Sequence, residues 1–410
     1  MALFASLAAP FLQQLTTSHV AAAVACSVAS GLRQYSHLAL NNVRPGVVGG
    51  PGNRSSVSGG VATVFGATGF VGKYVVNELA RRGTQVVVPY RSLEEKAMTL
   101  KQMGDLGQIV LLKGWHLNDD DMTRQAISRS NIVVNLIGST LETRNFSFDD
   151  VHAAWPARLA AMAKDTPKVE RLLHFSDVGA AADHASARMR SKAAGDAAVR
   201  ETFPDATIFK PAPIIGDEDD LLNNLLFQVK FNASVWMVDD GVQRFQPHHV
   251  TDVARAAAAS LESHEAKGKD YCLGGPETIT MREYVSLIQE CLHILEDTTM
   301  YVPAALAKAA YAPGDMLRRK LPPMPGRNYM YSGDYIDEIS RDKVVPEGSL
   351  GYGDLGILPM KVTEGFPIEA IRYQRTGGYS FGDSKALAKS LPASVKRYFG
   401  MQVPHQREGL

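Results

Sequence analysis

The chain has few cysteines, no excess of charge of either sign and no long apolar run. Its 410 residues include three cysteines, none in a CxxC pair, which argues against a disulfide scaffold and a cysteine-rich metal site. The 43 basic and 43 acidic residues cancel, which argues against a nucleic-acid-binding protein. No uncharged apolar run reaches the ~18 residues of a membrane-spanning helix. With 45% hydrophobic residues, the chain can form a sizeable core and more than one domain.

Acidic residues are missing from the first part of the chain. Residues 1–60 contain no Asp or Glu, three Arg and eight Ser, which is typical of an organelle transit peptide. Arg33 stands two residues before Tyr35, in a pattern that resembles mitochondrial processing sites. We therefore predict a mitochondrial transit peptide over residues 1–35; a chloroplast leader and an unstructured terminus are the alternatives. Residues 36–59 contain many Gly and Ser and predict a flexible linker.

A glycine motif follows directly on a short apolar segment. Val61–Phe65 predicts a strand, Gly66–Gly72 reads GATGFVG, and a helical pattern comes next. Gln85–Tyr90 predicts a second parallel strand, so the motif lies within a βαβ unit, the setting of dinucleotide-binding loops. The first glycine permits a tight turn, the second lets a pyrophosphate approach the backbone, and the third allows close packing of helix on strand.

The end of the second strand indicates which dinucleotide binds. NAD-binding proteins usually carry an acidic residue there, which binds the ribose hydroxyls. This chain has Tyr90 and Arg91 instead. A guanidinium suits a 2′-phosphate and does not accept hydrogen bonds from a diol. The sequence therefore predicts NADP(H), the alternative being that Arg91 is a solvated loop residue.

Strands alternate with helical segments along the following chain. Ile109–Leu112, Ile132–Gly138, Leu172–Phe175 and Thr207–Phe209 predict further strands, and Asp119–Asp121 predicts the capped start of a helix. The pattern predicts an α/β fold with a doubly wound parallel sheet. We assign the Rossmann domain to residues 60–260. A smaller mixed α/β distal domain and tail, partly interleaved with it, is assigned to residues 261–410.

These motifs resemble the extended and atypical short-chain dehydrogenase/reductase superfamily. The resemblance is carried by the glycine loop, the strand end at residues 135–138, the turn at residues 209–211 and the segment of residues 247–256. Five further segments are similar to the nucleotide-binding accessory subunits of mitochondrial respiratory complex I: residues 142–151, 190–196, 203–206, 354–357 and 369–375.

The resemblance implies a subunit that holds NADP(H) and supports the assembly or stability of the peripheral arm. It implies a position on the matrix side of the inner mitochondrial membrane, without a transmembrane span, among other complex I subunits. No metal ligand and no nucleic-acid partner is expected. The cofactor contacts that it implies are Gly66, Thr68, Gly69, Phe70, Val71, Gly72, Arg91, Leu136, Ile137, Gly138, Ser176, Lys192 and Pro211.

The superfamily's catalytic residues are incomplete in this chain. Its reductases use a Tyr as general acid, a Lys four residues later on the same helix face, and a nearby Ser. Ser176 and Lys192 stand where the Ser and the Lys are expected, but Arg188 stands in place of the Tyr. An Arg does not exchange a proton readily at neutral pH. We therefore predict a protein that is not an enzyme. The alternatives are an active organellar NADPH-dependent reductase with another acid, and a redox-sensing NADP(H) protein outside complex I.

Overall fold

The computed structural model describes residues 48–49, 56–91, 93–231, 235–291, 299–320 and 332–363. The predicted transit peptide and the tail segment 369–375 lie outside these residues. Within the predicted linker, β1 (Val48–Gly49) pairs antiparallel with β2 (Val57–Ser58). The chain forms two compact units. The first is Met1–Leu136 with Met162–Leu172, and the second is Ile137–Ala161 with Leu173–Leu410.

The main sheet has seven strands in the order β13-β8-β7-β6-β3-β4-β5. The strands are β3 (Val61–Phe65), β4 (Gln85–Tyr90), β5 (Ile109–Lys113), β6 (Ile132–Asn135), β7 (Arg171–Phe175), β8 (Thr207–Pro211) and β13 (Asp270–Leu273). Neighbouring strands pair in parallel, as in the register Ala62↔Val86 and Ala62↔Ile132. The strand order reverses between β3 and β6, which is the doubly wound arrangement. The predicted fold class is confirmed.

The central strand β3 is buried along its whole length. This explains why its sequence, VATVF, does not alternate between apolar and polar residues, since both faces of a parallel sheet are covered. Its one polar residue, Thr63, donates a 3.0 Å hydrogen bond to the carbonyl of Ala126 and lies 2.6 Å from the hydroxyl of Ser130. The buried hydroxyl is thus satisfied inside the protein.

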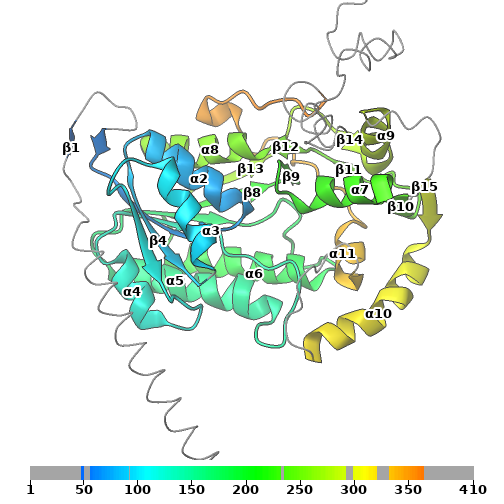
Figure 1. Ribbon diagram of the computed structural model, residues 1–410, viewed down its shortest axis with the longest axis horizontal. Helices are drawn as coiled ribbons and strands as arrows, with labels where there is room; N and C mark the ends of the chain where they lie inside the picture. Colours follow the sequence, from blue (N-terminus) through cyan, green and yellow to red (C-terminus); the bar gives the residue numbers. More distant parts are fainter. Residues whose placement is uncertain are drawn as a thin grey trace, which may run out of the picture. The chain divides into compact units, whose positions relative to one another are not determined.

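Among the described residues of the first unit, three α-helices follow strands of the sheet (Figure 1). They are α2 (Phe70–Arg81), α3 (Glu94–Met98) and α4 (Asp120–Ile127), and the 3₁₀ turn η1 (Thr99–Met103) continues α3. Helix α2 buries Val75, Val76 and Leu79, as its periodicity predicts. It ends before Gly83, whose φ of +78° is the left-handed conformation that favours glycine. The carboxylate of Asp119 accepts from the backbone N–H of Met122 at 2.9 Å, which confirms the predicted helix cap.

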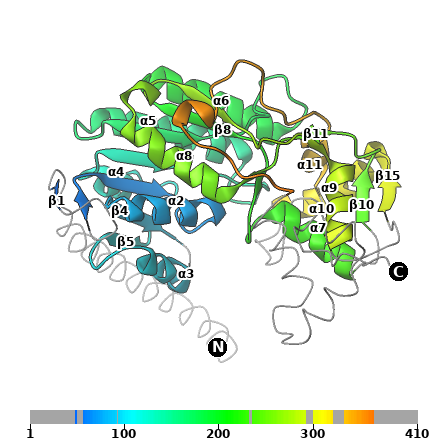
Figure 2. The same cartoon turned by 90° about the horizontal axis from the view of Figure 1, so that it is seen from above.

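The second unit combines long helices with short strand pairs. Its elements include the π-helical turn η2 (Asp150–Ala154), the first part of α5 (Trp155–Asp165), α6 (Ala187–Thr202), α7 (Asp220–Phe231), α8 (Val250–Glu262), η3 (His264–Ala266), α9 (Met281–Cys291), α10 (Ala304–Lys320), α11 (Gly333–Glu338) and η5 (Gly353–Leu355). The short strands pair as β9 (Ile214–Ile215) with β12 (His248–His249), β10 (Val235–Val238) with β15 (Thr299–Val302), and β11 (Arg244–Phe245) with β14 (Ile279–Thr280). Figure 2 shows α7, α9, β10 and β15 gathered together. A separate apolar core, which includes Leu225, Phe245, Tyr284 and Ile288, joins α7, α9, β10 and β11.

Candidate functional site

The glycine loop forms a tight turn that leads into a helix N-terminus. Gly66 follows β3 with a φ of +84°, and the N–H of Gly69 donates to the carbonyl of Gly66 at 3.0 Å. Helix α2 begins at Phe70 and has no acidic residue in its first turn. The N–H groups at the start of a helix have no partner within it, so together with the helix dipole they offer partial positive charge to an anion such as a pyrophosphate.

The second and third glycines of the loop differ in the space around them. A Cβ on Gly72 would lie 2.6 Å from the Cα of Ala67 and would also collide with the carbonyl oxygen of Gly66. A Cβ on Gly69 would lie 3.2 Å from that same oxygen, with no other non-neighbouring atom within 4 Å. Gly72 is therefore required for packing, as predicted, whereas the outer side of Gly69 is open. Nucleotide contacts of Gly69 and of Thr68, Phe70 and Val71 stay predictions.

Two more predicted contact residues of the first unit lie just beyond strand ends. Arg91 follows β4 directly and is exposed. Leu136 follows β6, and its N–H donates to the carbonyl of Phe65 at 3.0 Å. The strands β4, β3 and β6 are neighbours, and their carboxyl ends meet where the strand order reverses. Ligands of open α/β sheets bind at this position.

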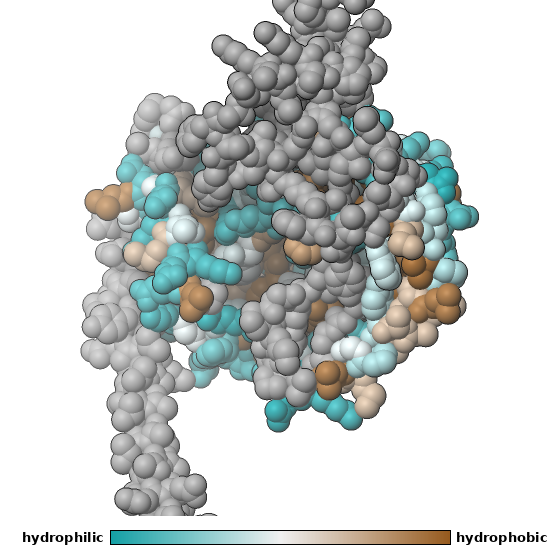
Figure 3. Space-filling model, turned by 45° about the vertical axis from the view of Figure 1, so that its right-hand side comes forward, coloured by the Kyte–Doolittle hydropathy of each residue, from teal (hydrophilic) through white to brown (hydrophobic). Residues whose placement is uncertain are grey.

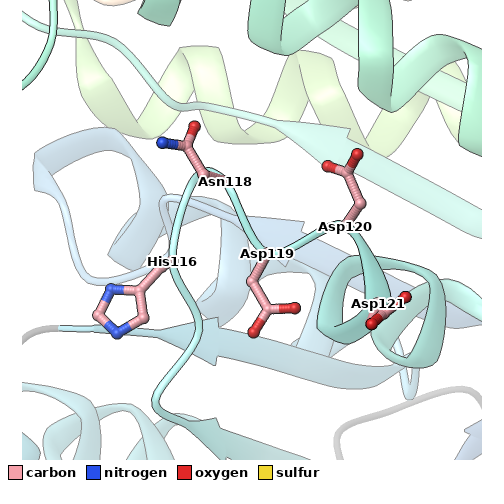
Figure 4. Close-up of a pocket in the computed structure, with 5 residues that line it drawn as sticks. All are labelled: His116, Asn118, Asp119, Asp120 and Asp121. Atoms are coloured by element: carbon pink, nitrogen blue, oxygen red, sulfur yellow. The ribbon is translucent and has the colours of Figure 1, made fainter.

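A polar cavity opens beyond β5 in the same unit (Figure 4). It measures about 470 Å³, and its lining residues are His116, Asn118, Asp119, Asp120 and Asp121. Three carboxylates would repel a pyrophosphate, and Asp119 already caps α4. This cavity is therefore less favourable to an anion than the glycine loop.

In the second unit, a buried histidine holds the chain after Gly138. The Nε2 atom of His152 accepts from the N–H of Ser139 at 3.0 Å, and its Nδ1 lies 3.0 Å from the hydroxyl of Ser191. Since Ser191 donates onward to the carbonyl of Arg188, the Nδ1 atom carries the ring proton. Burial lowers the pKa of His152 to about 2, and the charges of Lys192 and Arg188 add to the effect. No motif in the sequence pointed to this residue.

Ser176 and Lys192 are both engaged with neighbouring groups of the protein. The hydroxyl of Ser176, which is buried at the end of β7, donates to a carboxylate oxygen of Asp196 at 2.8 Å. The Nζ atom of Lys192 donates to the carbonyl of Ser176 at 3.1 Å and lies 3.7 Å from Asp177. Burial lowers the pKa of Lys192, against the opposing charge of Asp177. Pro211, at the buried end of β8, accepts from the N–H of Val178 at 3.0 Å.

Arg188 forms a buried ion pair with a residue from the distal chain. Its Nε and Nη2 atoms donate to the two carboxylate oxygens of Glu338 at 2.9 and 2.6 Å. The side chains are 10% and 3% exposed, so the pair is shielded from water. Although burial raises the pKa of Glu338, the charges of Arg188 and Lys343 outweigh it and hold the pKa below its usual value. The sequence alone did not indicate that Glu338 is the partner of Arg188, because the two residues are 150 positions apart.

Comparison with known proteins shows the families to which the chain belongs. Residues 62–274 match the model of the NAD dependent epimerase/dehydratase family. NADH dehydrogenase [ubiquinone] 1 alpha subcomplex subunit 9 of Arabidopsis thaliana is 39% identical over 364 residues, which are 88% of this chain and 89% of that protein. The chain belongs to the epimerase/dehydratase family and to the subunit 9 family.

Further relatives share most of their length with the chain. The Rattus norvegicus subunit of the same name is 36% identical over 93% of this chain and 95% of its own. The 40 kDa subunit of NADH-ubiquinone oxidoreductase from Neurospora crassa is 32% identical over 85% of this chain and 88% of its own. A solved dTDP-glucose 4,6-dehydratase of Streptomyces venezuelae with NAD and TYD bound has a TM-score of 0.56 at 17% identity. It is matched over 78% of this chain and 98% of its own, and supports the fold.

Proposed function

We propose that the chain is an accessory subunit of mitochondrial respiratory complex I that binds NADP(H) without turning it over. It lies on the matrix side of the inner membrane and supports the assembly or stability of the peripheral arm. The relatives named above are mitochondrial subunits of that enzyme, and they match this chain over most of their length. A ligand that binds only the folded form stabilises it, so a cofactor has a role without turnover.

The first unit supports the nucleotide part of the proposal. The glycine loop offers backbone N–H groups and a helix N-terminus to the pyrophosphate, and Gly69 leaves open space beside it. Arg91 is exposed directly after β4, where a guanidinium suits the 2′-phosphate of NADP(H). In the second unit, Ile137, Gly138, Ser176, Lys192 and Pro211 stay proposed contacts on the ground of the resemblance.

The absence of turnover is supported by one observation above all. The positions at which the superfamily uses Ser, Tyr and Lys each contact a carboxylate of this protein. Ser176 donates to Asp196, Arg188 to Glu338, and Lys192 lies beside Asp177. A Ser hydroxyl that donates its hydrogen bond to a carboxylate is poorly placed to polarise a substrate carbonyl. Arg188 does not supply a proton at neutral pH.

The surface of the second unit fits a protein that docks on partners. Exposed large apolar side chains come from neighbouring elements: Trp236 of β10, Met300 and Tyr301 of β15, and Leu306, Met316 and Leu317 of α10. Figure 3 shows apolar residues interspersed among hydrophilic ones on the surface of the molecule. Apolar surface of this kind marks interaction sites in soluble proteins. Among the described residues, no helix is long and apolar enough to cross a membrane.

Identification of the bound nucleotide tests the cofactor assignment. The chain is purified from mitochondria under mild conditions, unfolded, and the released small molecules are identified by mass spectrometry. The proposal predicts NADP⁺ or NADPH in near-stoichiometric amount. Release of NAD(H) alone, or of no dinucleotide, would contradict it. Steady consumption of NADPH by the purified chain with a carbonyl substrate would favour the reductase alternative.

A further inference from the structure

A segment of the distal chain, residues 332–345, is fastened across the first turns of α6. We call it the strap. It contains α11, whose Ser332 accepts from the N–H of Tyr335 at 3.2 Å and so caps the helix. At its far end, the N–H of Lys343 donates to the carbonyl of Arg244 at 2.8 Å, and Lys343 forms an isolated parallel β-bridge with Phe245 of β11. At its near end, the N–H of Gly333 donates to the carboxylate of Asp315 in α10 at 2.8 Å, so both ends of the strap are held.

The strap also supplies acceptors to the start of α6. The carboxylate of Asp334 accepts from the hydroxyl of Ser186 at 2.8 Å and from the N–H of Ala187 at 2.7 Å. These groups belong to the N-cap and the first residue of α6. Backbone N–H groups of a first helical turn have no partner within the helix, so an acidic side chain from elsewhere satisfies them.

The strongest contact is the carboxylate of Glu338 in a cationic site. Arg188 binds both of its oxygens, and Lys343 donates to one of them. Lys343 also lies 3.7 Å from Asp177, which in turn lies 3.7 Å from Lys192. Three cations therefore face two carboxylates in a site whose side chains are at most 16% exposed. Removing either carboxylate would leave buried positive charge without compensation, which is costly.

We propose that Glu338 acts as an internal ligand of an anion site formed by Arg188 and Lys343, and that the strap closes the first turns of α6 to substrates from solution. The inference deepens the non-catalytic part of the proposed function and rests on it. It gives the lack of turnover a second cause besides the missing tyrosine, which is the closure by a carboxylate from the distal chain. The chemical class that fits the site is a small carboxylate, because a carboxylate already binds there in bidentate fashion.

Removal of the internal carboxylate tests the proposal. In the full chain carrying Glu338→Ala, the anion site is vacated while its cations remain. The melting temperature is compared in sodium acetate and in sodium chloride at matched ionic strength. Acetate should restore part of the lost melting temperature, because a ligand that binds the folded form stabilises it. Wild type and Asp342→Ala, which removes an exposed carboxylate of the same strap, should melt alike in the two salts. Equal melting of Glu338→Ala in acetate and chloride would overturn the proposal.

A second measurement does not depend on that variant folding. Hydrogen exchange of the wild-type chain should show the amides of residues 333–338 protected together with the first turns of α6. If the amides of the strap exchanged fast while those of α6 stayed protected, the proposal that the strap closes α6 would be overturned. Neither measurement involves nucleotide or complex I. A failure here would therefore leave the proposed cofactor and complex membership standing, and loss of those would not affect the strap.

Discussion

The hydroxyl of Ser176 donates a hydrogen bond to a carboxylate oxygen of Asp196 at 2.8 Å, in a buried part of the second unit. The distance is typical of an O–H···O hydrogen bond. In a reductase of this superfamily the corresponding hydroxyl would be directed at the substrate. The serine is thus present in this chain, whereas its hydroxyl donates its hydrogen bond to Asp196.

From this relationship we predict that restoring the tyrosine does not restore catalysis. The variant Arg188→Tyr with Glu338→Gln regains the residue type of the general acid without leaving a buried unpaired carboxylate. It should show no NADPH consumption above wild type with a panel of aldehydes and ketones, because Ser176 and Lys192 remain bound to Asp196 and Asp177. Sustained, substrate-dependent NADPH oxidation by this variant would contradict the assignment of these contacts as structural.

Arg91 should discriminate between the two dinucleotides. Arg91→Asp removes the proposed partner of the 2′-phosphate and adds a repelling charge, so the affinity for NADPH should fall by about 10- to 100-fold, as for the loss of one charge-assisted hydrogen bond. The affinity for NADH should change little. Calorimetric titration of both nucleotides checks the difference, with Arg124→Asp as the control at an exposed site of the same unit. Equal weakening of NADPH and NADH would refute the role of Arg91.

Gly69→Val should abolish nucleotide retention in a folded chain. The new side chain extends into the open side of the loop, where the pyrophosphate is expected to approach, and its Cβ meets only the carbonyl oxygen of Gly66. The nucleotide content of the purified variant, with its circular dichroism spectrum as a check of folding, measures the effect. Full retention of nucleotide by the folded variant would contradict the phosphate-loop assignment.

Gly72→Ala provides the matched comparison. Its Cβ would press on the backbone of Ala67 and Gly66, so we expect a loss of roughly 1–3 kcal/mol in the free energy of unfolding. Urea denaturation measures this loss. Unchanged stability of Gly72→Ala would show that helix and loop are less tightly packed than described.

Two buried histidines should make the protein sensitive to mild acid. Burial lowers the pKa of His152 to about 2 and that of His248 to about 3, from an ordinary value of 6.5. Below pH 6.5 the unfolded chain therefore binds protons that the folded chain does not, so stability present above this pH is lost as the pH falls. Each histidine should contribute about 1.4 kcal/mol per pH unit.

The pH dependence of urea denaturation measures this effect. In His152→Gln, the slope of the free energy of unfolding against pH, measured below pH 6.5, should decrease by about 1.4 kcal/mol per pH unit, which corresponds to one proton. His264→Gln, at an exposed position, should leave the slope unchanged. An unchanged slope in His152→Gln would show that the folded chain protonates this ring.

Local patterns were sufficient to predict the sheet and the glycine loop. The strand over residues 61–65, the turn at Gly66 and the helix stop at Gly83 all depend on neighbouring residues, and the structure confirms them. The ion pair of Arg188 with Glu338 was not predictable, because it joins residues 150 apart that no periodic pattern relates. His152 was missed for the same reason: a single buried histidine leaves no mark in the sequence until its partner at Ser191 is known.

The most direct test of the central proposal is native electrophoresis of gently solubilised mitochondria that contain the tagged chain, followed by mass spectrometry of the band. We expect the chain to migrate with the respiratory complex I assembly and to be recovered together with other subunits of that enzyme. Migration as a free monomer or small oligomer, without those subunits, would contradict the proposed function.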